Sequence, residues 1–492
     1  MPKPQPFLSK TKYLDGIKCP KLLWNEFNNY DAIPKPDAEL QAIFDQGKKV
    51  GELAQKLYPK GIKLERQQMP EKTHANSIEA VKLRQPLFEA GLTYGRAYAL
   101  PDILVPVEDH AWDLIEVKSS TDVKDEYLID AAYQKYVYTG AGLKIRKCFL
   151  LHINNEYLRK GEIEVKKLFT KVDITDDIKP YESGLEKSIK EMLDIISGRE
   201  PKVKIGPQCA KPYACPLEEL CWGFLPKGDI FQLRGRQERL YELLDEGILK
   251  IIDIPIADWL SDKQLIQIKS HQTGKAHVDR EGIRDFLAEL KYPLYFLDFE
   301  TINPAIPIYD LSHPYEKVPF QFSLHIIEKE GGKPAHHGYL APGEVDPRPE
   351  VLKRLKSLLG SSGTILAWNM HFEIGCLEKA AEAYPEYKGW FSGLEKRFVD
   401  LIVPFRGFNY YHPAQEGSAS LKDVLPALTE LSYEGKEIAE GNAASREYSR
   451  VTFGSNIDEK DRQKVRQALE EYCKLDTQAM IEILEALKAE SK

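Results

Sequence analysis

The chain has 492 residues, of which 42% are hydrophobic and 29% are charged, and its formal net charge is −8. Its 7 cysteines exclude a disulfide scaffold, and the acidic total argues against nucleic-acid binding through overall positive charge. No signal peptide and no apolar run near the ~18 residues of a membrane span are present, so we expect a cytoplasmic protein without membrane contact.

The first candidate site lies between residues 101 and 118. Two apolar, β-rich runs flank a turn signal at 108–110, which predicts a hairpin-like pair of strands. Glu116 and Lys118 lie two apart on one face of the second strand, and Asp102 begins the first. Two carboxylates can hold a divalent metal while a neighbouring ammonium positions water, so the segment predicts a hydrolytic site.

Helical patterns surround these strands. Gln134 and Tyr138 lie four residues apart on a predicted helix downstream. Upstream, we expect a helical insertion near 38–90, with an amphipathic helix over 44–54.

These motifs resemble the Pro-Asp…Glu-x-Lys and Gln-x-x-x-Tyr signatures of RecB-like nucleases. The resemblance implies a restriction-endonuclease-like α/β domain over residues 1–224. The resemblance makes Asp102 and Glu116 metal ligands and Lys118 the residue that assists the water. It makes Gln134 and Tyr138 residues that contact substrate or shape the site. The family often has an upstream His or Glu ligand, and at about that place this chain offers Glu52. The alternative is that Asp102 caps a strand and Lys118 is a solvated lysine.

Four cysteines flank this domain. Cys19 lies before the nuclease-like segment, and Cys209, Cys215 and Cys221 follow it at six-residue intervals. The arrangement resembles the iron–sulfur group of RecB-like nucleases, including AddB and the CRISPR-associated RecB-like exonucleases, and implies a [4Fe–4S] cluster with a structural role. Zinc and free thiols remain alternatives. The other cysteines, Cys148, Cys376 and Cys473, are expected to be core residues.

A change of pattern follows residue 224. Leu225-Pro226-Lys227-Gly228 interrupts the chain, and helical periodicity over 225–290 predicts a helical bridge. Residues 291–492 alternate strand and helix patterns, which predicts a second α/β domain. We therefore expect an α/β protein with two domains and a helical bridge.

The second candidate site combines three carboxylate segments. Asp298 and Glu300 close an apolar strand, and Tyr472 and Asp476 lie four apart on a predicted helix. Glu373 follows another apolar run, Thr364–Trp368. Carboxylates from three segments can gather around two Mg²⁺ or Mn²⁺ ions, the arrangement that cleaves phosphodiesters.

The order of these segments resembles the DEDD exonucleases, the DnaQ-like branch of the ribonuclease H-like fold. The resemblance makes Asp298, Glu300 and Asp476 metal ligands, and Tyr472 the residue that orients the attacking water. Glu373 stands where the family usually has Asp, so Asp400 or Asp423 are alternatives. The stretch 417–426 also resembles an uncharacterised bacterial domain family allied to these exonucleases.

Together the motifs predict a metal-dependent nuclease that acts on DNA or RNA as a 3′–5′ exonuclease through the C-terminal site, with a second RecB-like site. The alternative is a nucleic-acid-binding subunit of a processing or defence complex in which one or both sites are inactive. An iron–sulfur electron carrier would leave both carboxylate groups unexplained.

Overall fold

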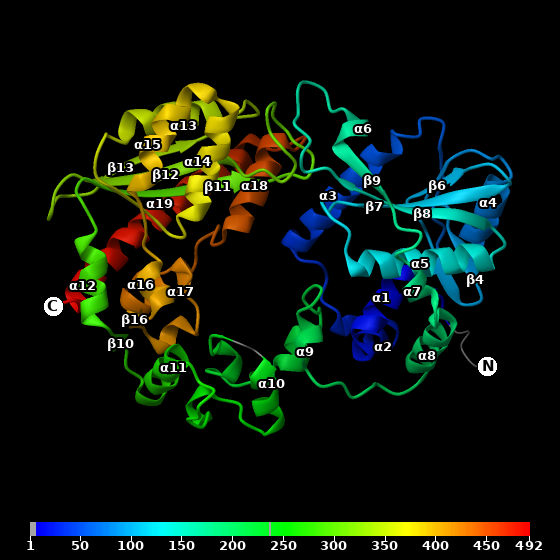
Figure 1. Cartoon of the computed structure of the whole chain (residues 1–492), viewed down its shortest axis with the longest axis horizontal. Helices are drawn as coiled ribbons and strands as arrows, with labels where there is room; N and C mark the ends of the chain where they lie inside the picture. Colours follow the sequence, from blue (N-terminus) through cyan, green and yellow to red (C-terminus); the bar gives the residue numbers. More distant parts are fainter. Residues whose placement is uncertain (1–5, 236–237) are drawn as a thin grey trace. The chain divides into compact units, whose positions relative to one another are not determined.

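The computed structural model describes residues 6–235 and 238–492, which divide into two compact units (Figure 1). Unit 1 extends to Phe224 and also includes Pro304–Tyr315. Unit 2 consists of Leu225–Asn303 and Glu316–Lys492. Each unit contains sheets and helices, so the expectation of an α/β protein is confirmed.

The main sheet of unit 1 has the strand order β2-β3-β6-β7-β8-β9. The predicted pair of strands is confirmed, because β6 and β7 are antiparallel neighbours with Ile103 opposite Ile115. β7 then runs parallel to β8, and α5 makes the crossover between them. The strands are β2 (Ile62–Lys63), β3 (Leu87–Phe88), β6 (Ile103–Pro106), β7 (Ala111–Lys118), β8 (Lys144–Ile153) and β9 (Phe169–Asp173).

Unit 1 also has a smaller sheet with the order β1-β5-β4, in which β1, near the start of the described chain, pairs with β5. Its strands are β1 (Leu8–Ser9), β4 (Leu92–Tyr94) and β5 (Ala97–Ala99). The helices of unit 1 are α1 (Lys10–Lys18), α2 (Pro20–Asn28), α3 (Ala38–Gln55), α4 (Pro70–Val81), α5 (Asp125–Gly140), α6 (Val165–Leu168), α7 (Lys179–Glu182), α8 (Leu185–Ser197) and α9 (Glu218–Trp222). The expected insertion over 38–90 is only partly helical, because β2 and β3 lie within it and extend the main sheet.

The Pro-rich segment 304–315 belongs to unit 1, although it follows β11 of unit 2 in the chain. Arg159 donates to the carbonyl oxygens of Pro307 and Ile308, and the Tyr315 hydroxyl donates to the carbonyl of Ser119. Ala305 is fully buried in the core of unit 1. The segment is therefore packed as part of that unit rather than as a free loop.

Unit 2 contains a sheet with the order β13-β12-β11-β14-β15, of which β11, β12 and β13 are labelled in Figure 1. β11 and β12 are antiparallel, and β14 and β15 continue the sheet in parallel with β11. Leu297 and Phe299 pack into the core formed with α13 and α14, so the alternate residues of β11 face the other side. The strands are β11 (Leu294–Ile302), β12 (Val318–Ile327), β13 (Ala335–Leu340), β14 (Thr364–Ala367) and β15 (Phe398–Asp400).

Helices cover both faces of this sheet. α13 and α14 pack on one side, and α19 packs along β11 and β12 on the other. The helices after β13 are α13 (Arg348–Leu358), α14 (His371–Ala383), α15 (Lys388–Leu394), α16 (Val403–Gly407), α17 (Leu421–Leu428), α18 (Gly441–Phe453) and α19 (Glu459–Glu490). The predicted strand before Glu300 and the predicted helix through Tyr472 are both confirmed.

Residues 225–290 form part of unit 2 and support one of its loops. They contain α10 (Glu238–Asp245), α11 (Asp262–Thr273), α12 (Arg280–Ala288) and β10 (His277–Val278), which pairs with β16 (Tyr410–Tyr411). Arg234 donates to the carbonyl oxygens of Phe405 and Gly417. Gly417 has a left-handed φ of 79°, and a Cβ there would lie 1.9 Å from the Gln232 carbonyl oxygen, so this position requires glycine.

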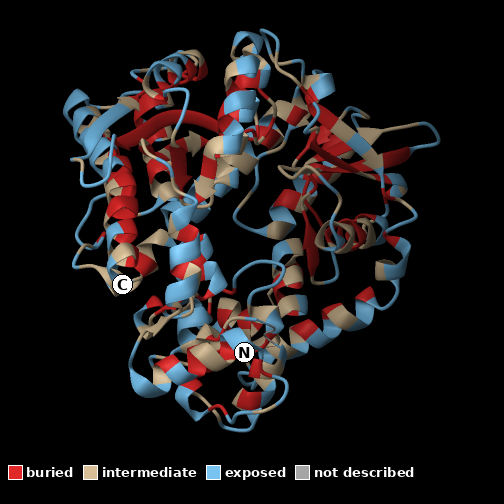
Figure 2. Ribbon diagram, turned by 60° about the vertical axis from the view of Figure 1, so that its left-hand side comes forward, coloured by how far each residue is buried: buried red, intermediate tan, exposed pale blue. Residues whose placement is uncertain are grey.

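The inner strands of the two larger sheets are largely buried, whereas the edge strand β13 is mostly exposed and the helices expose one face (Figure 2). Every described residue of β12 is buried. Along residues 6–235 and 238–492, no helix combines the length and the apolar character of a membrane span.

Candidate functional site

Four carboxylates of unit 2 converge from three elements. Asp298 and Glu300 lie on the face of β11 that α19 covers, and a register shift between Glu300 and Thr301 interrupts the strand pairing beside them. Asp476 lies on the buried side of α19, and Glu373 lies in the first turn of α14. The structure thus brings together the carboxylates that the three sequence motifs supply.

Cys473 joins this cluster, although we expected it to be an ordinary core residue. Ligand atoms of Asp298, Glu300 and Cys473 lie within 4.8 Å of one another, and the Cys473 thiol lies 3.6 Å from Asp298 Oδ2. Burial and the neighbouring carboxylates raise the pKa of Cys473 well above its usual value. The group is therefore a protonated thiol that donates to Asp298, and the hard-cation ligands are the carboxylates.

The carboxylates of this cluster resist ionisation. Burial, and then the charge of Asp476, raises the pKa of Asp298 well above its usual value. The pKa of Glu300 is raised by burial, Asp298 and Asp476, and that of Glu373 by burial and Asp298. Burial raises the pKa of Asp476 to about 7. Without a bound cation, the carboxylates of this cluster would repel one another if they were all ionised.

This donor set fits divalent cations such as Mg²⁺ or Mn²⁺. Glu373 Oε2 is buried and has no hydrogen-bond partner among the described residues, so one of its oxygens is available for a ligand. Carboxylate oxygens are the ligands that these cations prefer, and a bound cation offsets both the burial and the mutual repulsion that raise the pKa values.

Two residues beside the cluster were not predicted from the sequence. The Tyr433 hydroxyl donates to Asp476 Oδ1 at 2.5 Å, and its ring lies 6.0 Å from that of Tyr472, measured between centroids. Lys422 Nζ lies 5.9 Å from the Tyr472 ring centroid. Lys422 falls in the 417–426 stretch that the sequence singled out, whereas Tyr433 has no local motif.

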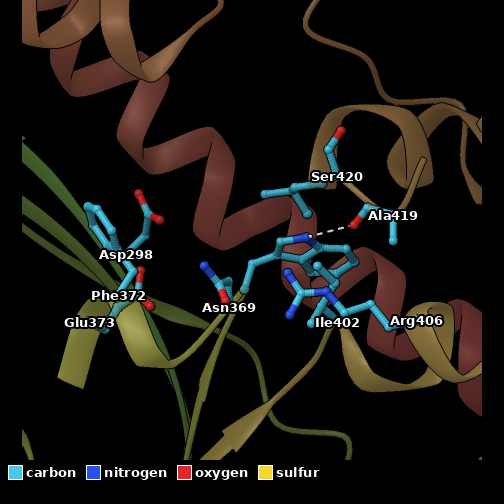
Figure 3. A pocket seen from close by; sticks show the side chains of 10 residues that line it. Asp298, Asn369, Phe372, Glu373, Ile402, Arg406, Ala419 and Ser420 are labelled. Atoms are coloured by element: carbon cyan, nitrogen blue, oxygen red, sulfur yellow. Dashed lines mark hydrogen bonds between the residues drawn. The ribbon is translucent and has the colours of Figure 1, made fainter. Parts of the chain in front are cut away.

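A pocket of about 500 Å³ opens beside the cluster (Figure 3). Asp298 and Glu373 lie on one side of it, and Arg406, Ala419 and Ser420 lie on the other. Its remaining lining is Trp368, Asn369, Phe372, Ile402 and Leu421. The Trp368 indole donates to the Ala419 carbonyl at 3.1 Å, and this hydrogen bond connects the segment after β14 to the segment before α17. Aromatic rings and a guanidinium beside carboxylates suit a nucleotide strand.

The two alternatives to Glu373 have other roles in the structure. Asp400 Oδ1 accepts from the backbone N–H groups of Asn369 and Ile402. Its bond to Asn369 holds that residue in a left-handed conformation, with φ of 71°. Asp423 bonds Ser420, which caps the start of α17.

The candidate residues of unit 1 also come together. Glu116 and Lys118 project from β7, Gln134 lies on α5, and Asp102 immediately precedes β6. Gln134 Nε2 donates to Glu116 Oε2 at 2.8 Å, and the backbone N–H of Val117 donates to Asp102 Oδ2 at 2.7 Å.

Two further residues complete this N-terminal cluster. Lys10, in the first turn of α1, lies 2.5 Å from Glu116 Oε1, and Lys118 lies 2.9 Å from the same oxygen. Asp130, which is buried on α5, accepts from Lys118 at 2.7 Å and from Gln134 at 2.8 Å. Asp130 lies four residues before Gln134, a helical spacing that could have identified it, but nothing in the sequence links Lys10 to Glu116.

The lysines determine the ionisation of the N-terminal cluster. Burial opposes the charge of Glu116, but Lys10 and Lys118 outweigh it and hold the pKa of Glu116 below its usual value. Burial likewise opposes the charge of Lys118, yet Asp130 and Glu116 keep its pKa well above the usual value. Asp102 differs, because burial and Glu116 raise its pKa to about 7.

Tyr138 and Glu52 lie apart from this network. Tyr138 is fully buried in the core, and its hydroxyl donates to the carbonyl of Ala90. Glu52 is exposed on α3, whereas Glu116 and Asp130 are buried.

The four flanking cysteines line one small pocket of unit 1. Cys19 joins α1 to α2, and Cys215 N–H donates to the Cys209 carbonyl at 2.7 Å. Burial raises the pKa of Cys215 and of Cys221. Glu218 also lines this pocket, but a set of four soft thiol donors suits an iron–sulfur cluster or zinc rather than Mg²⁺.

Comparison with known proteins yields a family and two relatives. A family described as "Domain of unknown function (DUF2779)" matches residues 295–420, which include Asp298, Glu300 and Glu373 but not Asp476. "Uncharacterized protein UU173" of Ureaplasma parvum is 27% identical over 221 residues, 40% of this chain and 32% of that protein. "Uncharacterized protein MG366 homolog" of Mycoplasma pneumoniae is 24% identical over 272 residues, 50% of this chain and 39% of that protein. The matches span well under half of these relatives.

Proposed function

We propose that the protein is a metal-dependent nuclease whose principal site is the carboxylate cluster of unit 2. The observation that carries the proposal is the convergence of four carboxylates with raised pKa values beside a pocket that has aromatic and basic lining. Such a cluster is unfavourable by itself and becomes favourable when divalent cations are bound.

Asp298, Glu300, Glu373 and Asp476 would hold the cations, which stabilise the attacking and leaving oxygens of phosphodiester hydrolysis. Tyr472, on the same helix as Asp476, orients the attacking water. Trp368 and Phe372 offer aromatic surfaces to bases, and Arg406 offers a guanidinium to a phosphate of the strand. We propose 3′–5′ exonuclease action on DNA or RNA, in keeping with the DEDD resemblance.

Unit 1 would supply a second, RecB-like site. There Asp102 and Glu116 hold a metal, Lys118 assists the water, and Gln134 orients Glu116 through the bond at 2.8 Å. Tyr138 shapes the site from the core. The four cysteines would hold a [4Fe–4S] cluster that ties α1 and α2 to the segment around Cys209–Cys221, with zinc as the alternative.

One observation favours a second candidate function for unit 1, that of a nucleic-acid-binding element without its own cleavage. Lys10 and Lys118 already pair with Glu116, so this cluster is balanced without a metal. In that case the protein would cleave only through unit 2, or act as the binding subunit of a processing or defence complex.

The test is degradation of end-labelled single- and double-stranded DNA and RNA by anaerobically purified protein with Mn²⁺ or Mg²⁺. Asp298→Ala should abolish one product pattern, and Asp285→Ala, at an exposed aspartate of α12, should leave it unchanged as a matched control. Lys118→Ala should remove a second pattern if unit 1 cleaves. If Asp298→Ala degrades every substrate as the wild type does, the proposed site is wrong. Iron and zinc analysis of the wild type and Cys215→Ser tests the cysteine site.

A further inference from the structure

Lys422 occupies an unusual position beside the C-terminal cluster. It lies in the first turn of α17, directly after Ser420 and Leu421, which line the pocket with Asp298 and Glu373. Its ammonium lies 5.9 Å from the Tyr472 ring centroid and 6.0 Å from that of Tyr433. Lys422 is thus the cation that the protein places beside the two tyrosines of the site.

The contacts of this ammonium within the described chain are with aromatic rings and not with carboxylates. No carboxylate of the described chain lies within ion-pairing distance of Lys422, although its charge opposes part of the rise in the pKa of Glu300 and of Asp476 that burial causes. By contrast, the lysines of the N-terminal cluster contact carboxylates at 2.5 and 2.9 Å. A half-buried lysine whose charge acts on Glu300 and Asp476 without an ion pair to either is available for an anion.

We infer that Lys422 binds a phosphate of the nucleic-acid strand that enters the pocket. This inference rests on the proposed nuclease function and adds a specific phosphate-binding residue to it. Once cations balance the four carboxylates, the electrostatic field around Lys422 is no longer dominated by acidic groups, and a phosphodiester is the anion that this site receives.

The chemistry of lysine agrees with this role. Its ammonium is a compact point charge on a flexible stem, so it can follow a phosphate without the fixed two-bond geometry that arginine imposes. The supporting loop is firmly held, because Gly417 packs on the Gln232 backbone and Trp368 donates to Ala419. The start of α17, and with it Lys422, is therefore set at a defined distance from the metal-binding carboxylates.

Binding of labelled single-stranded DNA and RNA in Ca²⁺, at KCl concentrations between about 50 and 200 mM, tests the inference. Lys422→Met should weaken binding of every sequence and reduce the slope of log affinity against log salt by about 1. Lys422→Arg should keep the slope. Lys329→Ala, in the exposed turn between β12 and β13, is the matched control and should behave as the wild type.

Mn²⁺ binding, followed by electron paramagnetic resonance, separates a phosphate contact from a structural role. We expect Lys422→Met to bind Mn²⁺ and to unfold thermally as the wild type does. If the wild type binds nucleic acid and Lys422→Met binds with the same affinity and slope, the inference is overturned while the proposed function stands. If the wild type binds Mn²⁺ but no nucleic acid of either kind, both are overturned.

Discussion

The two carboxylate clusters contain similar groups and have opposite electrostatic balance. In unit 1, Lys10 and Lys118 pair with Glu116, and its pKa lies below the usual value. In unit 2, the carboxylates repel one another, and the pKa of Asp298 lies well above the usual value. The nearby Lys422 remains outside ion-pairing distance of them.

Similar sets of buried side chains can therefore be either balanced by the protein itself or dependent on a bound ligand. A buried carboxylate that is paired with lysines of the same cluster needs no bound cation. Removing one charged partner destabilises the fold, because it leaves a buried charge without compensation. Buried carboxylates without internal cations must bind protons or metal ions. The first arrangement favours a stable fold, and the second favours a binding site.

The largest expected effect comes from Glu116→Gln, which would leave Lys10 and Lys118 with fewer carboxylates around them. We expect unit 1 to lose about 3–5 kcal/mol of stability, the usual effect of breaking a buried pair. Hydrogen exchange of β7 in metal-free protein measures it. The control Glu79→Gln, at a glutamate whose side chain is 71% exposed, should change the stability by less than about 0.5 kcal/mol. Equal exchange in both variants would contradict the balanced-cluster interpretation.

A smaller effect is expected for Lys10→Met, because Glu116 would keep Lys118 and Gln134 as partners. We expect a loss of about 2 kcal/mol without metal, less than for breaking the whole network. Mn²⁺ should restore more stability to this variant than it adds to the wild type, since it would replace the missing cation. Thermal unfolding with and without Mn²⁺ checks this, and the same increment in both proteins would sink the idea.

Tyr433→Phe sharpens the comparison at the other cluster. The hydroxyl that orients Asp476 would be lost, and outer partners of this kind typically change metal affinity by about 10–100-fold. Titration with Mn²⁺ measures the change. Tyr410→Phe, another buried tyrosine of unit 2, serves as the control. Unchanged affinity in Tyr433→Phe would show that Asp476 does not depend on this bond.

The smallest effect concerns pH. Because the pKa values of the C-terminal cluster are raised in the folded protein, protonation of these carboxyls stabilises the folded state. This contribution to the free energy of unfolding is fully present below about pH 4, where the carboxyls of the unfolded chain titrate. For Asp476 it is lost as the pH rises through about 7. Metal-free Asp298→Asn should therefore be more stable than wild type by about 1 kcal/mol at pH 8, and the difference should shrink toward pH 5. Thermal unfolding of both proteins across this range measures it. A less stable Asn variant at pH 8 would mean that Asp298 is not repelled by its neighbours.

Local patterns located much of both clusters. Asp298 and Glu300 were assigned to one strand face from their spacing of two, and Tyr472 and Asp476 to one helix face from their spacing of four. The pair of strands around residue 108 was likewise predicted by a turn signal between apolar runs. These predictions succeeded because the periodicity of a strand or a helix is set within a few residues.

Residues that complete the clusters were missed for a physical reason. Lys10 lies 106 residues from Glu116 in the chain, and Tyr433 lies 43 residues from Asp476. No periodicity spans such distances. The helical prediction for 38–90 also failed in part, because β2 and β3 are short strands that depend on pairing with neighbours.

The sequence by itself determined the α/β character of the chain, the carboxylate-bearing segments and the face of each element on which their side chains lie. The tertiary structure alone decided which cations those carboxylates meet. It brought Lys10 to Glu116 and Lys422 to the ring of Tyr472, and it placed 304–315 in unit 1. Charge balance depends on distances between segments far apart in the chain, and only the packing of sheets and helices sets those distances.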